Sequence, residues 1–100
     1  MFNKQEFHQF ISEGSCLLDG ATGSNLLLAG MPRGCCAEKW ILDHPQAIID
    51  LQRGYAEAGS QIIYAPTFQA NPIALEKEGL ANETERINAS LLALSRTAAP

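Results

Sequence analysis

A carboxylate followed at once by small residues is the feature of this sequence best suited to chemistry. Asp19 ends the apolar run 15–18, and the stretch "GATG" (20–23) follows it before a second apolar run begins at Leu26. A carboxylate can receive an ammonium group, and glycine-containing backbone can turn N–H groups toward an anion. Because an amino acid carries both charges on one carbon, the pattern favours an amino-acid head group as ligand. The alternative is that Asp19 caps the following helix and the glycines form the turn.

Thr67 is the second candidate, because it follows another apolar run. Residues 15–19 and 60–65 are each short, apolar and bounded by glycine or proline, and we interpret both as buried strands. A helix follows each, so the strands should be parallel neighbours joined by a right-handed crossover. Ligands of parallel α/β folds gather beyond the carboxyl ends of the strands, which places Asp19 and Thr67 at one edge. The stretch "GATG" matches neither the dinucleotide fingerprint nor the phosphate-binding loop.

The remaining elements are predicted to be helical and to support these two strands. Apolar residues recur at helical spacing, with Asn3, Pro45, Asn71 and the pair Asn82–Glu85 as start signals. Residues 31–40 are predicted as a loop. Helices are predicted over 3–13, 24–29, 45–58 and 71–79, and from 82 onward. The sequence ends without a third strand, and two parallel strands cannot be closed or covered on both faces. We therefore expect the opening part of a larger α/β domain.

Composition and charge narrow the possible partners. The chain has 100 residues, 46% of them apolar, and a formal net charge of −4. No basic stripe is visible, which argues against nucleic acid and against an acidic membrane surface. No apolar run is long enough to span a bilayer, and the amino terminus lacks the apolar segment of a signal peptide. We therefore expect a cytoplasmic protein.

Several matched stretches, in the correct order, resemble one family. The segments "LLDGATGSNLLLAGMP" (17–32) and "WILDHPQAIIDLQRGYAEAGSQIIYAPTFQANPIALEKEGL" (40–80) resemble the amino-terminal part of homocysteine S-methyltransferase domains. This family includes the homocysteine module of cobalamin-dependent methionine synthase and the betaine-homocysteine enzyme. The shared pieces are DGA-x-G after the first strand, HP before a helix, Y-x-x-AG before the second strand and TF-x-AN after it. The resemblance covers residues 15–80.

The resemblance implies a fold and a reaction. The fold is a (β/α)8 TIM barrel, of which residues 1–100 would be the amino-terminal part: an amino-terminal helix and the first two βα units. The reaction moves a methyl group onto a zinc-activated homocysteine thiolate and gives methionine. A family barrel needs about 250 residues, so the chain would be an incomplete part and inactive alone. By matched position, the resemblance assigns substrate binding to Asp19, Gly20, Ala21, Thr22 and Thr67, with Phe68 and Asn71 beside them. In this assignment Asp19 holds the amino group, and the loop that follows receives the carboxylate.

A role for zinc is implied only by the resemblance to the family. The family binds it through three cysteines, one after a later strand and an adjacent pair near the end of the barrel, and neither segment is present here. The pair in "RGCC" (33–36) mimics that motif at the wrong place, so Cys35 and Cys36 are interpreted as ordinary residues and Cys16 as a small buried hydrophobe. No metal ligand or catalytic residue is assigned to this chain. The methyl donor implied is methylcobalamin charged from folate, betaine or S-methylmethionine.

Two other hypotheses about function are compatible with the same residues. One is a small α/β module that binds an amino acid or an anion without catalysis. The other is a different barrel enzyme that uses the same edge for another substrate. If the chain by itself binds a ligand and unfolds cooperatively, the binding module is favoured. A longer parent sequence with a lone cysteine and a later Cys-Cys pair would favour the methyltransferase.

Overall fold

The protein is helical throughout, which contradicts the predicted fold class. A computed structural model describes residues 3–99, and helices make up 63% of it. The helices are α1 (Lys4–Ser12), α2 (Gly23–Leu28), α3 (Ala37–Asp43), α4 (Pro45–Ala58), α5 (Pro72–Leu75), the 3₁₀ turns η1 (Glu76–Glu78) and η2 (Ala81–Glu83), and α6 (Thr84–Ala98). No β-strand forms within residues 3–99. The prediction of an α/β fold with two βα units of a TIM barrel is therefore wrong.

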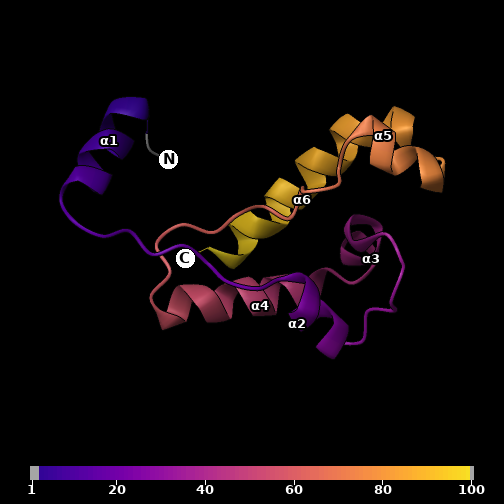
Figure 1. Cartoon of the computed structure of the whole chain (residues 1–100), viewed down its shortest axis with the longest axis horizontal. Coiled ribbons are helices and arrows are strands. Elements are labelled where there is room, and N and C mark those ends of the chain that lie inside the picture. Colours follow the sequence, from indigo (N-terminus) through magenta and orange to yellow (C-terminus); the bar gives the residue numbers. More distant parts are fainter. Residues whose placement is uncertain (1–2, 100) are drawn as a thin grey trace.

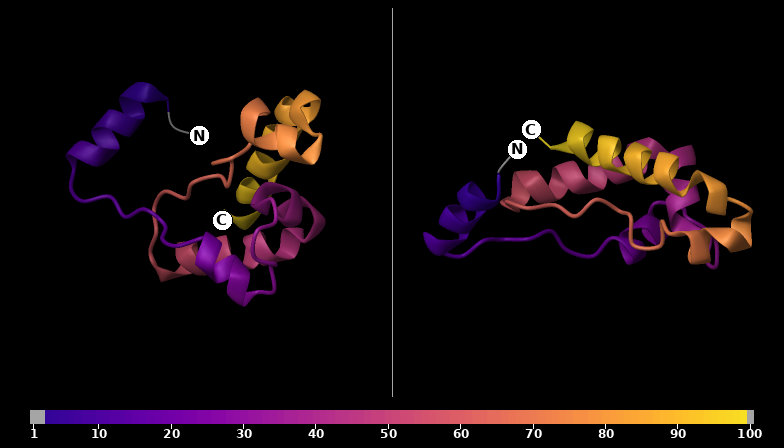
Figure 2. Two further views of the ribbon diagram at one scale, coloured as in Figure 1. Left: turned by 45° about the vertical axis from the view of Figure 1, so that its right-hand side comes forward. Right: turned by 90° about the horizontal axis from the view of Figure 1, so that it is seen from above.

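The two segments predicted as strands are extended and touch at one point. Residues 15–19 and 60–65 run in the same direction below the helices (Figure 2, right). A single parallel bridge joins Leu18 to Ile62. Around it, the backbone N–H of Asp19 donates to the Ile62 carbonyl at 3.0 Å, and the Ile62 N–H donates to the Leu17 carbonyl at 3.1 Å. The segments are parallel neighbours, but they do not form a ladder.

The side chains of the two residues that precede Ile62 bond to the backbone of the first segment. The Gln61 Oε1 atom accepts from the Leu17 N–H at 3.0 Å. The Ser60 hydroxyl donates to the Leu18 carbonyl at 3.1 Å. These backbone groups would otherwise be open to a neighbouring strand, and local side-chain bonds of this kind compete with regular secondary structure. The prediction failed because a polar residue at each of these positions offers the backbone another partner.

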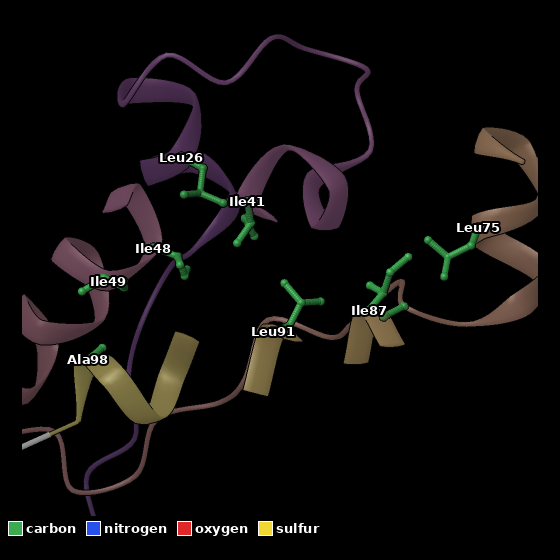
Figure 3. Packing of buried hydrophobic residues seen from close by; sticks show 9 residues of the cluster. Leu26, Ile41, Ile48, Ile49, Leu75, Ile87, Leu91 and Ala98 are labelled. Carbon is green, nitrogen blue, oxygen red and sulfur yellow. The ribbon is translucent and has the colours of Figure 1, made fainter. Parts of the chain in front are cut away.

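The core lies between α4 and α6, which pack side by side (Figure 1). Ile48 on α4 and Ile87 and Leu91 on α6 are almost completely buried. Leu26 of α2 and Ile41 of α3 point into the same cluster, as Figure 3 shows. Because Ile87 and Leu91 are four residues apart, they share one face of their helix, as the apolar spacing predicted.

α3 is an element that the sequence analysis missed. It occupies Ala37–Asp43, within and beyond the predicted loop 31–40, and its C-cap is His44, the residue before Pro45. Seven residues are too few to show a helical period clearly, but Ile41 is buried and anchors the helix in the core. Trp40 stacks on His44, with ring centroids 4.3 Å apart, and packs against the core. Trp40 is thus a packing residue.

Most predicted helix starts are confirmed. The Asn3 side chain accepts from the Glu6 N–H at 2.7 Å, and the Asn71 side chain accepts from the Ala74 N–H at 2.9 Å. The predicted capping box of Asn82 and Glu85 is wrong. Asn82 lies inside η2, and α6 begins two residues later without a side-chain cap.

α1 lies at one end of the molecule, separated from α4 and α6 by an extended stretch (Figure 1). None of its residues is buried. The helices α4 and α6 lie on one side of the extended segments (Figure 2, right). Leu17, Leu18 and Tyr64 in those segments are exposed. Within residues 3–99 no helix combines the length and the apolar character that crossing a bilayer requires.

Gly59 ends α4 in the left-handed conformation, with φ at +116°. Gly59→Ala should lower the free energy of unfolding by about 1–2 kcal/mol, because a Cβ atom is unfavourable in that conformation. Gly54 is the matched control, since it lies within α4 and a Cβ there meets nothing within 4 Å. Gly54→Ala should raise the free energy of unfolding by about 0.8–1 kcal/mol through helix propensity. Urea denaturation measures both, and equal shifts in one direction would contradict this account.

Candidate functional site

The Asp19 carboxylate has no partner within the described part of the chain. Its backbone N–H is fixed on the Ile62 carbonyl at 3.0 Å, and its side chain is half-buried. No residue between 3 and 99 makes a hydrogen bond or an ion pair to that carboxylate. The alternative in which Asp19 caps the next helix is wrong, because Thr22 holds the cap position of α2 and no side chain caps it. A fixed backbone thus presents an unpaired negative charge.

Backbone donors without acceptors follow this carboxylate directly. Among residues 3–99, the N–H groups of Gly20, Ala21 and Thr22 donate no hydrogen bond. Backbone N–H groups normally find a partner in the protein or in water. A carboxylate beside several open N–H groups presents a negative charge and a set of hydrogen-bond donors a short distance apart. This arrangement suits a ligand that carries both an ammonium and a carboxylate group.

Tyr55 of α4 holds the loop in place. Its hydroxyl donates to the Ala21 carbonyl at 2.8 Å, and the Asn25 amide of α2 donates to the same carbonyl at 2.9 Å. The Tyr55 ring lies against Gly20, where an added Cβ would come within 2.9 Å of the hydroxyl oxygen. Glycine at position 20 therefore allows the close approach of the ring. The sequence marks Tyr55 only as the tyrosine of the Y-x-x-AG piece and does not indicate this bond, because the loop partner of Tyr55 lies 34 residues away.

Tyr55→Phe should remove the hydroxyl bond to the Ala21 carbonyl, together with the longer bond of 3.4 Å that the hydroxyl accepts from the Asn25 amide, and keep the packing of the ring. We expect the free energy of unfolding to fall by about 0.5–1.5 kcal/mol, the usual net value of one hydrogen bond. Tyr64→Phe is the matched control, because Tyr64 is 64% exposed. Its hydroxyl has no partner between residues 3 and 99. Thermal unfolding measures both variants, and an equal loss in the control would show that the Ala21 bond is not the cause.

One cavity brings together two of the residues assigned from the sequence. It has a volume of about 630 Å³. Its wall includes Thr22, from the loop of residues 19–22 (the Asp19 loop), and Thr67, from the extended segment after Ile62. Phe68 also lines it and is 93% exposed. Asp19, Gly20 and Ala21 precede Thr22 in the chain and are not part of the wall. Asn71, the other neighbour assigned, caps α5 instead.

Glu38 is a cavity residue that the sequence analysis did not single out. It lies on α3, is 4% exposed and lines the cavity with Thr22 and Thr67. Its Oε2 atom accepts from the Gln69 N–H at 3.0 Å. No sequence signal marks this position, because Glu38 falls inside the predicted loop and its partner is 31 residues away.

The described residues do not form a metal site. Within residues 3–99 no group of three or more histidine, cysteine, aspartate or glutamate side chains could hold an ion. Cys35 is exposed, while Cys16 and Cys36 are half-buried, and all three are free thiols. Cys36 Sγ lies 4.0 Å from Glu38 Oε1, a weak sulfur contact. Cys16, predicted as a buried hydrophobe, is thus only partly covered.

Comparison with known proteins gives one clear match. The family model described as homocysteine S-methyltransferase matches residues 16–100 of the 100-residue chain. The match includes the Asp19 loop, Glu38, Tyr55 and Thr67, and α1 lies outside it. No solved structure matches the chain significantly.

Proposed function

The chain belongs to the homocysteine S-methyltransferase family, and on this premise we propose that its Asp19 loop binds the amino-acid end of homocysteine for S-methylation. One observation carries the proposal: the half-buried Asp19 carboxylate has no protein partner between residues 3 and 99 and stands beside backbone N–H groups that have no acceptor there. Burial of an unpaired charge is unfavourable. A ligand that supplies the opposite charge removes this cost.

Each group of the ligand has a proposed partner. The Asp19 carboxylate accepts hydrogen bonds from the ammonium group, and the N–H groups of Gly20 and Ala21 donate to the carboxylate. Charge-assisted hydrogen bonds of this kind are the strong ones. The sulfur-bearing end then extends toward the cavity that Thr22 and Thr67 line. Held at its amino-acid end, the ligand has fewer ways to orient its sulfur, which favours a transfer reaction.

The reaction proposed for the bound ligand is a methyl transfer. The homocysteine thiol must first lose its proton, because the thiolate is the nucleophile. The new bond forms between sulfur and the methyl carbon while the bond from that carbon to the donor breaks. The electron pair of the broken bond leaves with the donor, and the product is methionine. The same premise implies methylcobalamin, betaine or S-methylmethionine as the donor.

Zinc, which the family resemblance implies, does not fit the residues described. Bound zinc would supply stabilisation of the thiolate. Within residues 3–99 no set of side chains is arranged to ligate it, and the adjacent pair Cys35 and Cys36 offers at most two ligands. We therefore assign these residues the binding and orientation of homocysteine and no part in activating the sulfur.

A cytoplasmic location is part of the same proposal. All three cysteines are free, and disulfides are rare in reducing compartments. The net charge of −4 does not favour nucleic acid or an acidic membrane surface as partner. Homocysteine and a methyl donor are the partners that the proposal requires.

Binding of homocysteine and two truncated analogues tests the function. The protein that carries this sequence is titrated calorimetrically with L-homocysteine, with 4-mercaptobutyrate, which lacks the ammonium group, and with 3-aminopropanethiol, which lacks the carboxylate. We expect each analogue to bind at least about tenfold more weakly, since each loses one charge-assisted interaction. If both analogues bind as tightly as homocysteine, the loop does not recognise an amino acid and the proposal is wrong.

A further inference from the structure

The segment that carries Thr67 has no regular structure of its own, and side chains of three helices hold its backbone. Residues 63–71 lie between the bridge at Ile62 and the start of α5. Each helix contributes one polar side chain, and each side chain holds a different backbone group. The three bonds are Gln52 Nε2 of α4 to the Tyr64 carbonyl at 2.9 Å, Asn88 Nδ2 of α6 to the Ala70 carbonyl at 2.7 Å, and the Gln69 N–H to Glu38 Oε2 of α3 at 3.0 Å.

The Glu38 bond closes a gap in a tight turn. The Ala70 N–H donates to the Thr67 carbonyl at 3.0 Å, so residues 67–70 form a turn. In such a turn the N–H of the third residue, here Gln69, has no partner inside the turn. Glu38 accepts from that N–H and attaches the turn to α3. Thr67 is the first residue of the turn, so its position depends on this attachment.

Glu38 differs from the other two side chains in its location. It lines the cavity with Thr22 and Thr67, whereas Gln52 and Asn88 do not. It is also 4% exposed, and a buried carboxylate is unfavourable unless it is hydrogen-bonded. Its only other hydrogen bond within residues 3–99 is the weak one from Cys36 Sγ, at 4.0 Å. Packing alone would favour an apolar side chain here, so the value of this carboxylate lies in the bond to Gln69.

We propose that Glu38 is a positioning residue, which fixes the turn bearing Thr67 against the cavity and thereby sets the affinity for the amino-acid ligand. The inference about affinity rests on the proposed function, whereas the inference about the turn does not. Glu38 acts through the Gln69 N–H and makes no contact with the ligand. A glutamine at position 38 keeps an acceptor oxygen in the same place, so it should perform most of this role.

Hydrogen exchange at the Gln69 amide tests the attachment without any ligand. In Glu38→Ala, the Gln69 amide should exchange at least about tenfold faster, because it loses a charge-assisted acceptor. Glu38→Gln should keep the rate within about threefold of the original. Asp43→Ala is the control, since Asp43 is an exposed carboxylate on the same helix, and it should leave the Gln69 rate unchanged. An unchanged rate in Glu38→Ala, or equal acceleration of all core amides, overturns the proposal.

Homocysteine titration of the same variants tests the effect on the site. Glu38→Ala should weaken binding at least about tenfold, Glu38→Gln should restore it to within about threefold, and Asp43→Ala should bind as the original does. If Glu38→Gln binds as weakly as Glu38→Ala, the charge itself meets the ligand and the positioning role is wrong. If the original protein binds no homocysteine, the proposed function fails, and hydrogen exchange alone decides whether Glu38 positions the turn.

Discussion

Asp19→Asn is expected to weaken homocysteine binding by about ten- to a hundredfold, or about 1.5–3 kcal/mol, the range for hydrogen bonds to charged groups. Asparagine has the size of aspartate but lacks the negative charge that the ammonium group requires. The folded protein should lose no stability, because the carboxylate has no partner among residues 3–99 and its half-buried charge is unfavourable for folding. Calorimetric titration measures the affinity, and thermal unfolding measures the stability.

Asp43→Asn is the matched control for this prediction. It removes the same charge from an exposed carboxylate on α3 that is not part of the cavity wall. The control should change the affinity by less than about twofold. A loss of stability in Asp19→Asn with unchanged affinity would mean that Asp19 serves the fold and not a ligand.

Leu91→Ala is expected to lower the free energy of unfolding by about 2–5 kcal/mol, the range for removing a buried leucine side chain. Leu91 is fully buried on α6, in the cluster with Ile87 and Ile48 (Figure 3). Its loss leaves a cavity where α4 and α6 meet. Domains of this size have a total stability of about 5–15 kcal/mol, so this one change removes a large part of it.

The neighbouring residue gives the control. Leu92 has the same side chain and is 45% exposed. Leu92→Ala should cost less than about 1 kcal/mol, because little apolar area leaves the core. Urea denaturation measures both variants. Equal losses would show that the α4–α6 contact is not where the stability lies.

Most of the helices, α3 excepted, could be predicted because their signals are local. α4 begins at Pro45 and ends at a left-handed Gly59, and both residues act through backbone geometry that the sequence displays directly. The buried positions Ile87 and Leu91 follow from helical spacing. Such features need no knowledge of the rest of the chain.

The extended segments could not be predicted correctly, because strand formation depends on distant partners. Residues 15–19 and 60–65 have the composition of buried strands. Whether they form a ladder depends on which groups take their backbone bonds, and here Gln61 and Ser60 take two of them. The family resemblance is confirmed by the family match, while the barrel units that it implied are absent from residues 3–99.

The candidate site also has a part that could be predicted from the sequence and a part that could not. The sequence marks the Asp19 loop, since a carboxylate followed by glycine and small residues is visible in one short stretch. Tyr55 and Glu38, by contrast, act on loop backbone 34 and 31 residues away. Tyr55 is the tyrosine of the Y-x-x-AG piece, but nothing near either residue in the sequence indicates its loop partner. Their roles therefore emerge only when the fold brings α4 and α3 to the loops.

The central claim is that Asp19 meets the ammonium group of homocysteine. The most direct measurement compares the affinities of homocysteine and 4-mercaptobutyrate in the original protein and in Asp19→Asn. If the Asp19 carboxylate and the ammonium group bind each other, removing one of them leaves the other with almost no effect on the affinity. We predict at least about a tenfold preference for homocysteine in the original protein and almost none in the variant. A preference that survives unchanged in Asp19→Asn would contradict the claim.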